Sequence, residues 1–387
     1  MKNQFYPRLF QPLKLDGIRL KNRITMAPLY LGYAGSGGTM SPLLLHHYKR
    51  MAQSGAALIV VENAGIAPGG SGASRTIRCD HNRYLKGLEG LASIIKKEKA
   101  RAALQINHAG RFAHVPDPVA PSAVPAFGNT PRALTQREIT TIEKQFADAA
   151  LRVKKSGFDL AELHGGTGYL LAQFVSPRTN KREDAYGGPI ENRIRFPLEV
   201  VKRVKDRVGD FPVGYRFLAE EWLPDGLHVD EAKVLARTLE AAGVAYISVM
   251  GGTYESFFIP DVVTKSRKPG YMVPLAKAVK ESVKVPVIAA GRISTPALAE
   301  SILEEKKADL IGLARMLWVD PEWPIKARQG KDRAIRKCSP GCDACLQLVM
   351  QGKPAFCPKW KKEKRKEYRE LFKRPPGVGP NQRIVIK

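Results

Sequence analysis

A short run of titratable and glycine residues stands out in the middle of the chain. An apolar segment, residues 158–163, is followed at once by His164, Thr167 and Tyr169. Three interleaved glycines let the backbone turn tightly and come close to a flat ligand. A long polar loop follows at residues 176–192, and loops of that length in compact domains usually carry function. The stretch predicts an active site at the carboxyl end of a strand.

A second group of reactive side chains lies near the carboxyl end of the chain. Four of the five cysteines fall within twenty residues, namely Cys338, Cys342, Cys345 and Cys357. Clustered thiols in an intracellular protein indicate metal binding rather than disulfides. Four thiolates bind either a [4Fe–4S] cluster or structural Zn²⁺, and the absence of two distant C-x2-C pairs favours the cluster. The isolated Cys79 is expected to be an inert thiol.

Eight short apolar runs recur along the chain, each followed by a segment with helical periodicity. They are residues 23–29, 57–63, 102–107, 158–163, 213–218, 245–250, 285–290 and 309–314. Continuous apolar strands that alternate with helices indicate a parallel sheet covered on both faces, and eight such units predict an α/β fold, a (β/α)8 TIM barrel. A doubly wound open sheet is the alternative, but no glycine-rich dinucleotide turn follows the first run.

The composition limits the organisation and the surroundings of the protein. The 387 residues suffice for a barrel at 1–330, a four-cysteine segment at 331–360 and a basic tail at 361–387, with a helix over residues 359–374. No apolar run is long enough to cross a bilayer and the start lacks a signal peptide, so a cytoplasmic protein without membrane contact is expected.

The charge of the chain is strongly positive. An excess of 63 Lys and Arg over 37 Asp and Glu gives a net charge of +26. The charge is either a solvated surface or an attraction to polyanions: nucleic acid, the phosphates of an acyl-CoA, or an acidic electron-transfer protein. Because the basic residues are spread along the chain without an aromatic-interleaved motif, nucleic acid is an unlikely partner.

Polar residues inside or directly after the apolar runs indicate a ligand. Gln105 lies within the third run, where an amide needs a hydrogen-bond partner. Arg216 lies within the fifth, where a guanidinium is costly unless an anion meets it. In TIM barrels a phosphate site is commonly formed after the last two strands, where Gly291 allows close approach and Arg292 and Arg315 supply cationic donors.

Residues 164–193 also carry a family resemblance. They read H-x-x-x-G-Y-L-x-x-x-F-x-S-P-x-x-N-x-R-x-D-x-Y-G-G-x-x-x-N-R, which resembles the signature of the old yellow enzyme family of flavin reductases. The resemblance implies a TIM barrel that binds FMN. The cofactor-binding residues it implies are Ala27, Pro28, Leu29, Asn63, Gln105, Arg216, Gly291, Arg292, Ala314 and Arg315. Some relatives have a flavin-bonding cysteine where this chain has Tyr30, so the flavin is expected to be non-covalent.

The resemblance also implies catalytic roles. Tyr169 matches the family's proton donor and His164 the first of two residues that bind the substrate carbonyl. The second is commonly His or Asn, whereas this chain has Thr167. Tyr254 takes roughly the place of a catalytic histidine of the 2,4-dienoyl-CoA reductase branch, and is either catalytic or an aromatic lid. His108 is expected to be structural.

The four cysteines extend the resemblance to one branch of the family. A [4Fe–4S] cluster after the barrel is typical of the 2,4-dienoyl-CoA reductase, 2-enoate reductase and trimethylamine dehydrogenase branch, although the first two gaps between the cysteines are exchanged here. In that branch a further FAD- and NAD(P)H-binding domain supplies electrons. Residues 380–387 resemble its first strand without the glycine-rich turn. The expected donor is NAD(P)H or a separate acidic protein or flavoprotein subunit; the alternative is that the sequence is a shortened form.

The expected function is therefore reduction of the activated C=C bond of an unsaturated dienoyl or cyclic acyl-CoA or enoate, with electrons passing from the cluster to FMN. One rival is an amine or other dehydrogenase of the trimethylamine dehydrogenase type, which needs an aromatic cage for a cation. The other is an electron-transfer or nucleic-acid-binding subunit without a substrate of its own. A homo-oligomer is possible.

Overall fold

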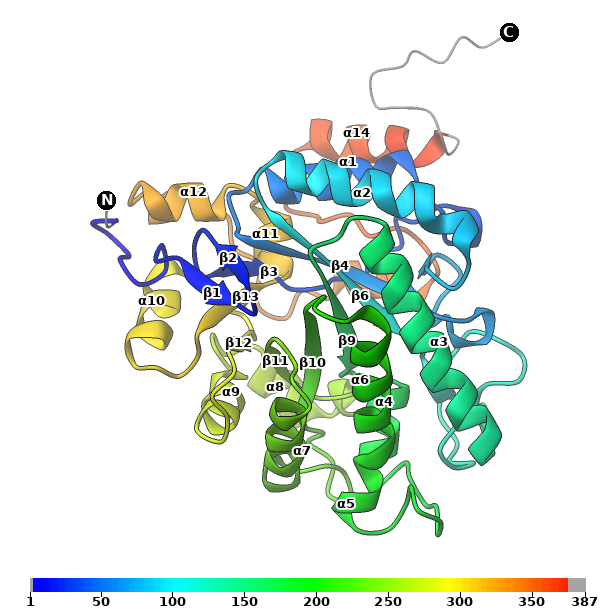
Figure 1. The fold of residues 1–387 in the computed structure, drawn as a ribbon. Helices are drawn as coiled ribbons and strands as arrows, with labels where there is room; N and C mark the ends of the chain where they lie inside the picture. Colours follow the sequence, from blue (N-terminus) through cyan, green and yellow to red (C-terminus); the bar gives the residue numbers. More distant parts are fainter. Residues whose placement is uncertain (1–2, 375–387) are drawn as a thin grey trace, which may run out of the picture.

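The computed structural model describes residues 3–374 and shows a closed barrel of eight parallel strands (Figure 1). The barrel strands are β3 (Ile24–Met26), β4 (Leu58–Gly65), β6 (Arg101–Asn107), β9 (Leu160–Gly165), β10 (Val213–Glu220), β11 (Ile247–Gly251), β12 (Val287–Ala289) and β13 (Leu310–Leu313). Each pairs with the next, and β13 closes on β3 through Ile311 beside Ile24. The prediction of a TIM barrel is confirmed.

Helices surround the barrel and extend beyond its last strand. They are α1 (Pro42–Ala52), α2 (Leu85–Lys97), α3 (Gln136–Lys155), α4 (Leu170–Val175), α5 (Ile190–Arg193), α6 (Arg195–Val208), α7 (Val229–Ala241), α8 (Pro260–Ser266), α9 (Val273–Lys280), α10 (Pro296–Glu304), α11 (Arg315–Val319), α12 (Trp323–Arg328), α13 (Ala344–Met350) and α14 (Lys362–Lys373). Short strands outside the barrel are β1 (Leu13–Leu15), β2 (Ile18–Leu20), β5 (Ile77–Arg78), β7 (Val119–Ala120) and β8 (Arg132–Ala133).

Local sequence signals explain where these elements begin. The strands are apolar runs with both faces buried, as in β4, where all eight residues are buried. The longest helix, α3, starts at a capping box in which Thr135 and Glu138 satisfy each other's backbone amides. Helix α10 combines a Thr295 cap with proline in its first turn.

The expected elements lie close to their predicted positions. Strand β9 begins two residues after the predicted start and includes His164, which was expected just beyond its end. The helix expected at 359–374 is α14. The polar loop expected at 176–192 is shortened by α5. The strand-like segment 380–387 lies outside the described residues.

The interior of the barrel holds a buried carboxylate. Glu162 on β9 is fully buried and accepts hydrogen bonds from Gln105 Nε2 on β6 (2.7 Å) and from the Tyr246 hydroxyl, just before β11 (2.7 Å). Burial raises the pKa of Glu162, and the positive charge of Arg216 opposes that rise. These contacts connect β9 with its neighbour β6 and with the start of β11, two strands away, through a polar layer inside the barrel.

The chain after the barrel packs on the loop that follows β3. The Tyr33 hydroxyl donates to the Ala355 carbonyl (2.6 Å), and the Ala355 amide donates to the Leu31 carbonyl (2.9 Å). Trp360 continues this packing against Trp318, with ring centroids 4.8 Å apart. Ala355 and Trp360 belong to the same hydrophobic core as the barrel, so the segment is an integral part of its packing.

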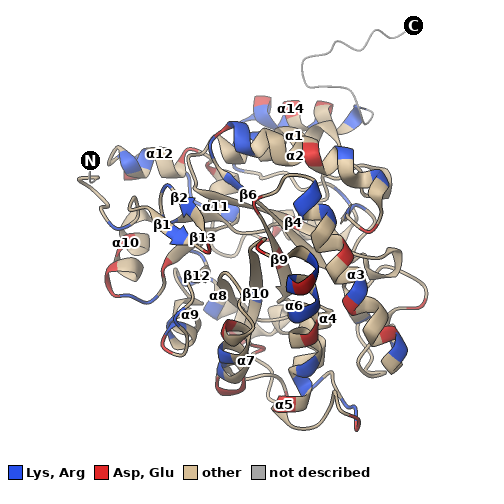
Figure 2. Cartoon of the chain, in the orientation of Figure 1, with Lys and Arg blue, Asp and Glu red and all other residues tan. Residues whose placement is uncertain are grey.

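Charged residues are distributed over the helices all round the barrel, and α14 carries several basic residues beside α1 (Figure 2). None of the helices between residues 3 and 374 combines the length and hydropathy needed to cross a bilayer.

A buried glutamate makes the stability of the fold dependent on pH. Burial raises the pKa of Glu62 on β4 to about 8, partly opposed by the hydrogen bond that its carboxylate accepts from the Leu31 amide (2.9 Å). Between the unfolded pKa and about 8, the folded protein holds a proton that the unfolded chain has lost, so stability falls as pH rises. Glu62→Gln removes this ionisation.

We expect the Glu62→Gln variant to gain unfolding free energy relative to the wild type, by about 1.4 kcal/mol per pH unit between pH 5 and pH 8. Urea unfolding at several pH values measures the difference. The control is Glu89→Gln on the exposed face of α2, which makes the same replacement outside the core. A Glu62→Gln effect that is equal at pH 5 and pH 8 would contradict the prediction.

Candidate functional site

The three residues expected to be catalytic meet above the carboxyl ends of β9 and β11. The hydroxyls of Tyr169 and Tyr254 are 2.8 Å apart, and the rings of His164 and Tyr169 meet edge to face with centroids 4.9 Å apart. Tyr169 is the residue before α4, whereas Tyr254 lies in the loop after β11. Residues 85 positions apart in the sequence therefore share one hydrogen bond.

The geometry of His164 fixes which ring nitrogen can donate. Its Nδ1 accepts a hydrogen bond from the Gly166 amide (3.2 Å). Burial lowers the pKa of His164 to about 3, with a further contribution from the positive charge of Arg216. The ring is therefore neutral at physiological pH and carries its proton on Nε2, where it can donate to a carbonyl oxygen.

The two tyrosines are protonated at neutral pH. Burial raises the pKa of both Tyr169 and Tyr254. They form a small apolar cluster with Ala109, Phe112 and Ala113, apart from the main core. Such a pair can supply one proton to a ligand and recover it through the neighbouring hydroxyl.

Backbone strain accompanies this site. Thr167, at the position expected to hold the second carbonyl-binding residue, has φ +59°, an uncommon conformation for a β-branched residue. Its hydroxyl faces the Met250 sulfur at 3.5 Å. Trp222 and Arg292, near the ends of two other barrel strands, also have positive φ. Strained residues of this kind gather at functional sites.

A cavity lined by three arginines lies over the ends of β12 and β13. Its volume is about 140 Å³, and its lining includes Ala27, Arg216, Gly291, Arg292, Ala314 and Arg315, six of the residues expected to bind FMN. Burial lowers the pKa of Arg292, and the charge of Arg315 lowers it further. In the described part of the chain, neither arginine forms an ion pair with a carboxylate, which fits a site for an anion such as a phosphate.

The other expected cofactor residues are divided between two environments. Arg216 donates from Nη1 to the Ser248 hydroxyl (2.7 Å). Gln105 belongs to the polar layer around Glu162, to which it donates a hydrogen bond. Asn63 faces a second cavity of about 360 Å³ together with Tyr30, Tyr169 and Tyr254. Pro28 and Leu29 follow β3 and are partly buried. In the sequence they lie between Ala27, which lines the arginine cavity, and Tyr30, which lines the second cavity. His108 is buried and accepts from the Gly110 amide (3.1 Å), as a structural residue would.

One of the four clustered cysteines, Cys338, lies at the arginine cavity. Cys338 lines it, and Arg292 Nη1 donates to the Cys338 carbonyl (3.5 Å). Burial raises the pKa of Cys345 and Cys357, and the nearby Cys338 and Cys342 raise both further. All four are free thiols in one neighbourhood. Among residues 3–374, however, no three His, Cys, Asp or Glu side chains converge as a metal-ligand set, so the metal site stays a prediction.

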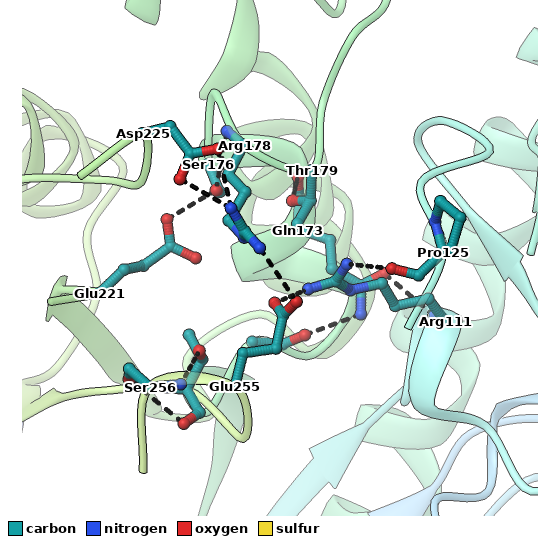
Figure 3. A network of polar contacts seen from close by, with 12 residues as sticks. Arg111, Pro125, Gln173, Ser176, Arg178, Thr179, Glu221, Asp225, Glu255 and Ser256 are labelled. Atoms are coloured by element: carbon teal, nitrogen blue, oxygen red, sulfur yellow. Dashed lines mark hydrogen bonds and ion pairs between the residues drawn. The ribbon is translucent and has the colours of Figure 1, made fainter. Parts of the chain in front are cut away.

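A polar network that the sequence did not indicate holds the loop of Tyr254 (Figure 3). The buried Arg111, after β6, forms an ion pair with Glu255, the residue that follows Tyr254. Arg178 contacts the other Glu255 oxygen (3.4 Å) and pairs with Asp225 (2.7 Å). Four of the loops at the carboxyl ends of the strands are thereby connected. Only the position of Arg111, four residues after the end of the apolar strand β6, could have indicated its role.

The amide of Gln173 on α4 supports the same loops. Its Oε1 accepts from the Arg111 backbone amide (3.2 Å), while its Nε2 donates to the Gly168 carbonyl (2.7 Å) and the Ala109 carbonyl (3.1 Å). Gln173 is almost fully buried. It therefore connects the loop after β6 to the turn that presents Tyr169.

The chain is similar to known proteins over most of its length. Residues 8–334 match the model described as the NADH:flavin oxidoreductase / NADH oxidase family. The chain is 41% identical over 343 residues to an NADH oxidase of Thermoanaerobacter brockii, covering 86% of this chain and 52% of that protein. It is 42% identical over 357 residues to a metal reductase of Desulforamulus reducens, covering 90% and 53%. The chain thus spans about half the length of these curated relatives.

A solved structure is similar over almost the whole chain. It is a 2-naphthoyl-CoA reductase in complex with 2-naphthoyl-CoA, with a TM-score of 0.88 and 27% sequence identity. The similarity covers 95% of this chain and 58% of that one.

The ion pair between Arg111 and Glu255, the residue after Tyr254, leads to a stability prediction. Glu255→Gln removes the charge opposite Arg111, whose side chain is 2% exposed, and should lower the free energy of unfolding by about 2–4 kcal/mol. The control, Asp225→Asn, removes a partner of Arg178 that is 56% exposed and should cost less than about 1 kcal/mol. Urea unfolding of both variants measures the difference. Equal losses of unfolding free energy in the two variants would contradict a stabilising role of Glu255 as the partner of the buried Arg111.

Proposed function

The chain belongs to the NADH:flavin oxidoreductase / NADH oxidase family, and from this premise we propose that it is an FMN-dependent ene-reductase acting on an unsaturated acyl-CoA or enoate. The observation that carries the proposal is the pair of hydroxyls of Tyr169 and Tyr254, 2.8 Å apart and beside a neutral His164. An acid pair next to a neutral hydrogen-bond donor suits protonation of a carbon adjacent to a carbonyl.

The residues at the arginine cavity would hold FMN. Arg292 and Arg315 lack carboxylate partners in the described chain and would bind the phosphate, with Gly291 and Ala314 lining the same cavity. Arg216 would stabilise negative charge on the ring, which Ala27, Asn63 and Gln105 would contact. When bound, FMN supplies a hydride to the β-carbon of the activated alkene.

The protein's own groups would hold and protonate the substrate. His164 Nε2–H and the Thr167 hydroxyl would donate to the carbonyl oxygen, which draws charge away from the C=C bond. Tyr169 would then give its proton to the α-carbon, and Tyr254 or water would return a proton to Tyr169. The raised pKa of Tyr169 keeps that proton available throughout the physiological range.

The source of electrons forms a second part of the proposal. Cys338 at the arginine cavity and the three cysteines that follow it would supply the four thiolates that a [4Fe–4S] cluster needs, although they do not converge in the described structure. NAD(P)H or an acidic partner protein would provide the electrons, and the positive charge of +26 supports attraction to such partners. Rapid turnover with NADH alone would contradict the need for a partner protein.

A second candidate function is oxidation of an amine. The aromatic residues Tyr30, Phe112, Phe127, Tyr169 and Tyr254 line the cavity that would receive the substrate. Aromatic faces attract organic cations, so the cavity can serve as the cage that an amine dehydrogenase requires. Reduction of the flavin by amines, but no oxidation of the reduced flavin by enoyl thioesters, would favour this function.

Replacement of the expected proton donor tests the reaction. Tyr169→Phe should lower kcat for an enoyl-CoA roughly 100-fold or more while leaving FMN content unchanged, because the proton is lost but the cofactor contacts remain. The control is Tyr215→Phe, since the buried Tyr215 hydroxyl has no partner among the described residues. Full activity of Tyr169→Phe would contradict its role.

Cofactor analysis of anaerobically purified protein tests the cofactors. We expect FMN in the released flavin fraction and about four irons per chain, with a broad visible absorption from the cluster. FMN together with zinc would retain the reductase but exclude the cluster. Protein with neither flavin nor metal after reconstitution would overturn the proposal.

A further inference from the structure

Exposed apolar side chains gather at the mouth of the tyrosine-lined cavity. The described structure has six large hydrophobic residues that are at least 38% exposed, and three of them, Phe127, Leu346 and Met350, line this one cavity. Their exposed fractions are 64%, 38% and 63%. Apolar side chains left in water around a cavity indicate a binding surface.

These side chains come from two segments far apart in the sequence. Phe127 lies between β7 and β8, with its ring 5.7 Å from that of Phe112. Leu346, Val349 and Met350 belong to α13, at positions i, i+3 and i+4, and so lie on one face of that helix. Helix α13 belongs to the cysteine segment and lies beyond residue 334, where the match to the family model ends.

The cavity combines a reactive end with an apolar end. Tyr169 and Tyr254 mark the first, while Phe127 and the α13 face mark the second. The lining contains no Asp or Glu, and the charge of its single arginine, Arg111, is paired with Glu255. A volume of about 360 Å³ is at the small end for pockets that enclose a whole ligand, so a nucleotide carrier would stay outside.

We propose that α13 of the cysteine segment and Phe127 form a binding site for a bulky apolar group on the β-carbon side of the substrate, so that the enzyme prefers aromatic or similarly large unsaturated substrates over short aliphatic ones. The inference rests on the proposed ene-reductase function and adds the substrate class. Burial of the exposed side chains of α13 against that group provides the affinity.

Two matched pairs of ligands test the preference. Cinnamaldehyde and crotonaldehyde share the unsaturated aldehyde and differ in a phenyl or methyl group on the β-carbon; cinnamoyl-CoA and crotonyl-CoA differ in the same way. Dissociation constants are measured with oxidised, FMN-loaded protein and no reductant, from the change in flavin absorbance. In each pair whose members bind, we expect the phenyl compound to have a dissociation constant about tenfold lower than that of the methyl compound.

Variants of α13 connect the preference to this surface. Leu346→Ala combined with Met350→Ala should weaken cinnamaldehyde binding about fivefold or more and change crotonaldehyde binding by less than about twofold. Ile325→Ala removes an equally exposed apolar side chain on α12, outside the cavity, and should change neither. Met350→Ser alone and Phe127→Ala provide the same test if the double variant does not fold.

The outcomes separate the inference from the proposed function. Equal binding of the phenyl and methyl compounds, or variants that weaken both equally, would overturn the inference. Preference for cinnamaldehyde that depends on α13, without binding of either thioester, would support the inference and contradict the acyl-CoA substrate. Binding of none of the four ligands by FMN-loaded protein would overturn both.

Discussion

The Glu162 carboxylate, fully buried inside the barrel, is the constraint on which the arrangement of the site depends. A charge or an unpaired carboxyl in that position is costly, so the neighbouring strands must supply partners. They do so through Gln105 and Tyr246, with Arg216 close enough to oppose the rise in the pKa of Glu162. These partners fix side chains just below the cavities where ligands would bind. The polar layer thus holds Gln105, a residue expected to bind the cofactor, through its hydrogen bond to Glu162.

Above that layer, loops hold the reacting groups in place. Glu255 forms ion pairs with arginines from two different loops and is the chain neighbour of Tyr254. The position of the Tyr254 phenol therefore depends on contacts with residues 77 and 144 positions from Glu255 in the sequence. Positive φ angles at Thr167 and Arg292 show that the backbone at two strand ends is held in unfavourable conformations. A rigid scaffold with strained, cross-linked loops suits a reaction that needs accurate placement of a proton donor.

The sequence predicted the barrel well because each buried strand is a continuous apolar run, visible without knowledge of its neighbours. All eight predicted strands are present. Tyr169, His164 and Tyr254 were named from a motif, and the structure brings them together, but their roles stay predictions. Glu162 was missed because a single carboxylate inside an apolar run carries no local sign of its partners. The Arg111 and Glu255 pair and the α13 wall were missed because they arise from contacts between distant segments.

The attachment of the cysteine segment has a consequence for how such enzymes diversify. The segment lies beyond the part matched by the family model, and it is joined to the barrel by Ala355, which bonds Leu31 and Tyr33 in the loop after β3. Because the segment is packed into the core of the barrel, exchanging it whole would disturb the fold, whereas Leu346 and Met350 on α13 are exposed and lie outside that core. Selection, or an engineer, can therefore vary these proposed substrate contacts while the barrel and its packing are inherited intact.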